Sequence, residues 1–80
     1  MISEKKVISI IQSVLGAENK INLKSSSNNT EDWDSLAHLN ILEKLDKVSK
    51  GKAGNIAELA TAGSVKKILS ILKKKKLLSK

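Results

Sequence analysis

One segment of the chain carries side chains that could do chemistry. In Asp34-Ser35-Leu36 a hydroxyl lies between a carboxylate and an apolar residue, and His38 follows three residues after Ser35. If a helix begins here, its unpaired backbone N–H groups and its dipole favour a phosphate at the serine hydroxyl. The segment therefore predicts a modification or binding site at Ser35.

A serine hydrolase centre and a calcium loop are the other chemistries that these residues suggest, and both fit poorly. Asp34, Ser35 and His38 could form a nucleophile triad, but adjacent residues on a helix diverge by about 100°. Asp34 and Glu43 match ligand positions of an EF-hand loop, whereas Ala37 stands where that loop needs glycine. We therefore expect neither catalysis nor a metal site, and we interpret His38 as a polar surface residue.

Helical periodicity predicts the elements that position this segment. Apolar residues recur at steps of three and four over residues 3–15 and again over residues 35–48. Ser3 is the expected N-cap of the first helix, and Gly16 is expected to end it. The polar residues between these helices, 16–33, hold no period and predict a long loop.

The second half of the chain predicts two more helices. A short one is expected at about residues 55–60, and a long one at about 64–78, capped by Ser64. Strand-like alternation is confined to residues 21–23. The predicted fold class is therefore all-α: a four-helix bundle with a long first loop and a short third helix, in one domain over residues 1–80.

Composition limits the function classes. Eighty residues allow one small domain, which is too small to enclose a substrate. The chain has no cysteine, which excludes disulfide bonds and thiolate metal sites, and no apolar run that could serve as an export signal or cross a membrane. We expect a cytoplasmic protein.

The charge is unevenly distributed. The chain has a net charge of +7, yet residues 31–46 hold five acidic residues against Lys44 alone, for −4. All 15 basic residues are lysine and Trp33 is the only aromatic residue, so arginine forks and stacking platforms for nucleic acid are both missing. The run at residues 73–76 fits either a basic surface for an anionic partner or solvated cations at a helix C-terminus.

Asp34-Ser35-Leu36 at the start of a helix resembles the phosphopantetheine attachment motif of the acyl carrier protein family. With Trp33 before it, the motif is similar to those of stand-alone carriers of specialised pathways and of peptidyl carriers. The predicted helix order and the residues leading into the last helix, 61–65, extend the resemblance over nearly the whole chain.

The resemblance implies a carrier without enzyme activity of its own. Ser35 would carry 4′-phosphopantetheine from coenzyme A, attached by a phosphopantetheinyl transferase, and the arm would hold an acyl or aminoacyl group as a thioester. The other expected partners are a loading ligase and downstream synthases or transferases, met by a monomer. The residues expected to contact them are Asp34, Leu36, His38, Glu43 and Asp46, although Leu36 could equally pack in the core.

The chain also departs from that family. Its members are typically acidic, whereas this chain is basic, and its second predicted helix ends without a bulky apolar residue. We therefore expect a carrier of a specialised fatty acid or polyketide pathway. The alternative is a non-enzymatic basic module that binds nucleic acid or an anionic membrane through the lysine-rich last helix, without inserting stably into the bilayer.

Overall fold

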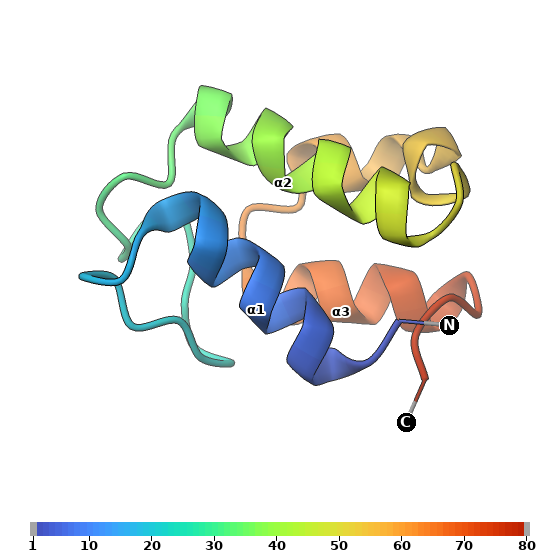
Figure 1. The fold of residues 1–80 in the computed structure, drawn as a ribbon, viewed down its shortest axis with the longest axis horizontal. Coiled ribbons are helices and arrows are strands. Elements are labelled where there is room, and N and C mark those ends of the chain that lie inside the picture. Colours follow the sequence, from blue (N-terminus) through green and yellow to red (C-terminus); the bar gives the residue numbers. More distant parts are fainter. Residues whose placement is uncertain (1, 80) are drawn as a thin grey trace.

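The computed structural model describes residues 2–79 and is all-α, with three α-helices. They are α1 (Glu4–Leu15), α2 (Ser35–Val48) and α3 (Val65–Lys74). Two short 3₁₀ segments, η1 (Ala53–Asn55) and η2 (Ala57–Thr61), connect α2 to α3. In Figure 1, α2 lies above α1 and α3, and both chain ends lie on the side where α2 ends.

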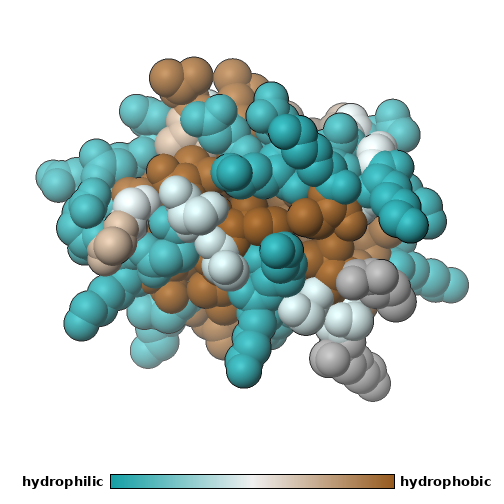
Figure 2. Space-filling view, in the orientation of Figure 1, coloured by the Kyte–Doolittle hydropathy of each residue, from teal (hydrophilic) through white to brown (hydrophobic). Residues whose placement is uncertain are grey.

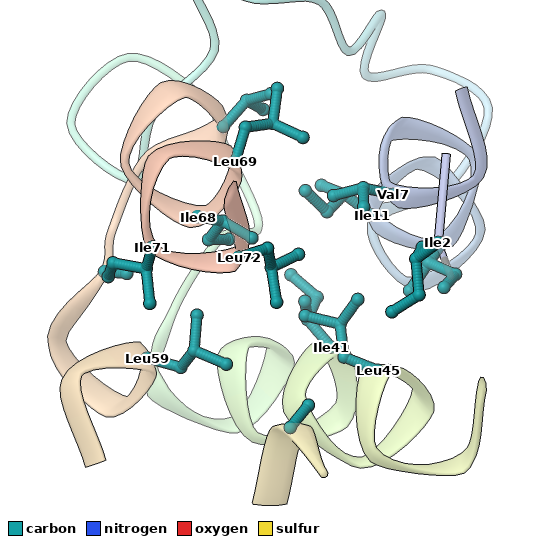
Figure 3. Packing of buried hydrophobic residues seen from close by; sticks show 14 of the residues in the cluster. Ile2, Val7, Ile11, Ile41, Leu45, Leu59, Ile68, Leu69, Ile71 and Leu72 are labelled. Carbon is teal, nitrogen blue, oxygen red and sulfur yellow. The ribbon is translucent and has the colours of Figure 1, made fainter. Parts of the chain in front are cut away.

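The core lies where the three α-helices meet. Each contributes side chains that are completely shielded from solvent, such as Ile11 of α1, Ile41 and Leu45 of α2, and Ile68 of α3. Figure 3 shows these side chains pointing toward one another between the helices. Leu59 of η2 joins the same cluster, so the η2 segment closes the core although it is not an α-helix.

Side-chain caps set the helix beginnings. The Ser3 hydroxyl accepts a hydrogen bond from the Lys6 amide at 3.0 Å, and the Ser64 hydroxyl accepts one from the Lys67 amide at 3.1 Å. Both predicted caps are therefore confirmed. Gly16 ends α1 with a φ of 93°, a left-handed conformation that glycine adopts without steric cost.

The long loop between α1 and α2 is held against the start of α3. Residues on either side of the antiparallel bridge between Ser26 and Ser64 exchange backbone hydrogen bonds. The Ser27 amide donates to the Gly63 carbonyl at 2.7 Å, and the Val65 amide donates to the Ser25 carbonyl at 3.0 Å. This pairing fixes the loop beside the N-terminus of α2.

Two predicted helices differ from the structure. The short helix expected at residues 55–60 is replaced by η1 and η2, so a four-helix bundle is not observed in the described residues. The last helix was expected to reach residue 78 but ends at Lys74. Lys76 has a φ of 61°, and the Leu77 amide bonds to the Leu72 carbonyl at 2.8 Å, which together form a Schellman motif.

Candidate functional site

Ser35 is the first residue of α2 and is exposed to solvent. Asp34 before it is the N-cap, and its side-chain Oδ1 accepts a hydrogen bond from the Ala37 amide at 2.9 Å. The amides of the first helical turn have no carbonyl partner within the helix, so they contribute a positive potential near the serine hydroxyl, which the adjacent Asp34 carboxylate offsets in part. The Ser35 hydroxyl is therefore accessible at a place suited to a phosphate ester.

A shallow groove of about 590 Å³ opens beside Ser35. Three parts of the chain line it: the first two turns of α2, the long loop at Ser27, and the segment that leads into α3. The last of these contributes Ala60, Thr61 and Gly63. A side chain at position 63 would meet the Ser27 hydroxyl, since a Cβ there would lie 2.8 Å from its Oγ. Glycine thus lets the two walls approach.

The His38 ring joins three parts of the structure. Its Nδ1 accepts a hydrogen bond from the indole N–H of Trp33 at 3.1 Å, and its Nε2 lies 2.8 Å from the Leu59 carbonyl. These partners require the neutral tautomer with the proton on Nε2. The Trp33 and His38 rings are also stacked, with centroids 6.2 Å apart.

His38 is therefore not the free polar surface residue that the sequence predicted. The residue is half-buried and lines the groove, and the hydrogen bonds of its ring connect the loop, α2 and η2. Trp33, which is 5% exposed, is fixed next to Asp34 by the same bond. His38 thus holds the chain in position immediately before the candidate site.

The acidic residues expected to meet partners differ in their surroundings. Glu43 is exposed on α2, whereas the Asp34 carboxylate caps the helix. Asp46 is half-buried near the other end of α2, where its Oδ1 accepts a hydrogen bond from the Gly54 amide at 2.9 Å. The carboxylates of Asp34 and Asp46 therefore each accept a hydrogen bond from a backbone amide of this chain, whereas no such bond is described for Glu43.

Leu36 is 69% exposed, which excludes its alternative role in the core. Leu39, one turn later, is 62% exposed and lines the groove beside Ser35. Together these side chains present an apolar surface next to the serine hydroxyl. Burying such surface against another molecule would be favourable, at about 25 cal/mol per Å².

The sequence prediction missed the groove residues that lie far from Ser35 along the chain. Ser27 and Thr61 flank the same groove only because the loop pairs with the residues before α3. Gly63 was the one available signal, since a glycine before a helix cap can mark a close approach of two backbones. Its partner could not be named from the sequence.

Within residues 2–79, no group of three or more potential ligand side chains could hold a metal ion. None of the helices described is long and apolar enough to cross a bilayer.

Comparisons with protein families, with curated proteins and with solved structures found no match for this chain.

Proposed function

We propose that this protein is a carrier of the acyl carrier protein type, with Ser35 as the attachment site for 4′-phosphopantetheine. The observation that carries the proposal is the exposed hydroxyl at the first residue of α2, beside an open groove. The motif Asp34-Ser35-Leu36 stands at this position. The η1 and η2 segments lie where that family has a short third helix.

The residues around Ser35 fit this group. The hydroxyl is accessible to a transferase, and the N-terminal potential of α2 favours the negative charge of a phosphodiester. Leu39 and Leu42 give the groove an apolar surface that the carried acyl group could contact. When attached, the group would supply the thiol that the chain lacks, and that thiol would hold a carboxylic acid as a thioester.

The chain's own residues would present and orient the attachment point rather than catalyse. Asp34 caps α2 and so fixes the backbone beside the hydroxyl, while Trp33 and His38 anchor the loop that precedes it. Exposed Leu36 and Glu43 would contact successive partner enzymes: a phosphopantetheinyl transferase, a loading ligase, and a synthase or transferase. The charged contact made by Glu43 would act mainly on the rate and the specificity of association.

We place this carrier in the cytoplasm, in a specialised pathway, and as a monomer. Tethering would raise the local concentration of the carried group at each partner enzyme. The net charge of +7 would favour partner enzymes whose docking surfaces are not strongly basic, because like charges repel.

The test is an intact-mass measurement after incubation with coenzyme A, magnesium and a phosphopantetheinyl transferase of broad specificity. We expect a gain of one phosphopantetheine group in the wild type and no gain in Ser35→Ala. Ser27→Ala is the matched control, because Ser27 is an exposed serine that lines the same groove. It should be modified like the wild type.

An unchanged wild-type mass, or a mass gain that persists in Ser35→Ala, would refute the proposal. Far-UV circular dichroism of each variant checks that the fold is retained. An unrelated carrier protein, modified in the same reaction, shows that the transferase is active.

A further inference from the structure

A lysine-lined surface lies at the opposite end of α2 from Ser35. One groove of about 370 Å³ runs between α1 and α2, and a second of about 250 Å³ lies where α2 ends near the chain termini. Val48 lines both, so the two grooves form one surface, here called the basic face. Its lysines are Lys6, Lys44 and Lys47 in the first groove and Lys50, Lys52 and Lys76 in the second.

These six lysines have no acidic neighbours in the grooves. All six are exposed, and no acidic residue lines either groove. Among the described residues, the ion pairs instead join Glu58 to Lys74 and Lys75 of the last helix and its cap. None of the six lysines of the basic face therefore takes part in an ion pair with a described residue, whereas Lys74 and Lys75 do.

Helix capping accounts for only part of this surface. Lys47 and Lys50 lie at the C-terminal end of α2, where cations complement the helix dipole. Lys6 lies in the first turn of α1, where a cation is unfavourable. Lys50 and Lys76 have φ values of 57° and 61°, positions at helix ends that suit glycine better than lysine. Stability of the helices therefore does not explain the set.

The apolar part of the face is aliphatic, and Val48 is its exposed member. Val48 is 40% exposed at the junction of the two grooves, and Ile10 lines the first of them. Figure 2 shows apolar surface between hydrophilic side chains on the face where α1 and α2 lie side by side. The methylene groups of lysine side chains around such a surface can pack on an apolar partner surface, while their ammonium groups stay in contact with water or with anionic groups.

We propose that the basic face docks reversibly on an anionic phospholipid surface. Clusters of four to eight lysines are attracted to such membranes without fixed hydrogen-bond geometry. Nucleic acid is the weaker fit, because the chain has no arginine and its one aromatic residue, Trp33, is 5% exposed. The breadth of the face, which spans α1, α2 and both chain ends, matches a flat array of phosphates better than a narrow peptide.

Docking in this way would leave Ser35 free. The 14 residues of α2 rise about 1.5 Å each, which places Ser35 about 20 Å along the helix from Val48. The basic face and the groove beside Ser35 have no lining residue in common, so binding at one does not cover residues of the other. The inference is independent of what Ser35 carries.

Vesicle sedimentation tests the proposal with the unmodified full chain. We expect binding to vesicles of phosphatidylcholine with phosphatidylglycerol, weak binding to phosphatidylcholine alone, and release by high salt. The variant Lys6→Gln/Lys44→Gln/Lys47→Gln should bind on the order of a hundred-fold more weakly, at about fivefold for each lost charge.

The matched control is Lys66→Gln/Lys67→Gln/Lys73→Gln. It removes the same charge from exposed positions of α3 that line neither groove, and it should bind like the wild type. Circular dichroism checks that both triple variants are folded. If the first of them is unfolded, Lys44→Gln alone is used instead, and it should bind about fivefold more weakly than the wild type.

Three results would overturn the proposal. The first is no binding of the wild type to anionic vesicles at low salt, and the second is equal loss in the two triple variants, which would make net charge alone responsible. The third is tighter binding to duplex DNA or to a poly-glutamate peptide than to the vesicles, measured at the same salt concentration.

Discussion

Replacing His38 by alanine should destabilise the fold through two lost hydrogen bonds. The indole N–H of Trp33 and the carbonyl of Leu59 would each lose the imidazole as partner. Both residues are buried, at 5% and 1% exposure, so water can replace the ring only in part. A buried polar group left without its partner costs about 1–3 kcal/mol.

The indole N–H of Trp33 would be left without a partner, whereas the Leu59 carbonyl would keep its hydrogen bond from the Ala62 amide at 3.2 Å, so this cost applies mainly to the indole. We expect His38→Ala to lower the free energy of unfolding by about 1–3 kcal/mol. The total for an 80-residue chain is roughly 4–12 kcal/mol, so the loss should be clear in a urea titration.

Far-UV circular dichroism is the suitable signal, because Trp33 is the only aromatic residue and belongs to the perturbed contact. Asn40→Ala is the matched control: it is exposed on the same helix and should change the free energy by less than about 0.5 kcal/mol. Trp33→Phe keeps an aromatic ring but removes the donor, and a double-mutant cycle with His38→Ala isolates that bond.

The reasoning is refuted if His38→Ala is as stable as Asn40→Ala. It is also refuted if the cycle gives no coupling between positions 33 and 38, since the hydrogen bond from the indole to the imidazole would then contribute nothing measurable.

Two further predictions concern packing and helix ends. Leu45→Ala should lower the free energy of unfolding by about 2–5 kcal/mol because its side chain is fully buried, whereas Leu36→Ala should change it by less than about 0.5 kcal/mol; equal urea midpoints for the two variants would contradict the packing described. Lys76→Gly should raise the free energy of unfolding by about 0.5–1 kcal/mol, because glycine takes the left-handed conformation without steric cost, and the melting temperature should rise with it. A lower melting temperature would argue against the Schellman motif at the end of α3.

The sequence predicted well those features that depend on local patterns. The periodic apolar residues of α1 and α2, and the hydroxyls of Ser3 and Ser64, act within one or two helical turns. The same is true of Gly16 at the end of α1. For this reason the bounds predicted for α2 agree with the structure, and Ser35 stands at its first residue.

Features that depend on contacts between distant segments could not be predicted. The leucine repeat of α2 continues through Leu36 and Leu39, but no described segment covers these two side chains, so both are exposed. His38 is fixed because η2 brings the Leu59 carbonyl to its ring. The end of α3 was missed because lysine, not glycine, occupies the left-handed position at residue 76.

The pairing of the two chain ends has a practical consequence for handling this protein. The Ile2 amide bonds to the Leu77 carbonyl at 2.9 Å, and the Ser79 amide bonds to the Ile2 carbonyl at 2.7 Å. An affinity tag or fluorophore fused at either terminus would thus project away from Ser35 but would crowd the second groove. Fusions should suit assays of Ser35 modification, whereas liposome experiments need protein from which every tag has been cleaved.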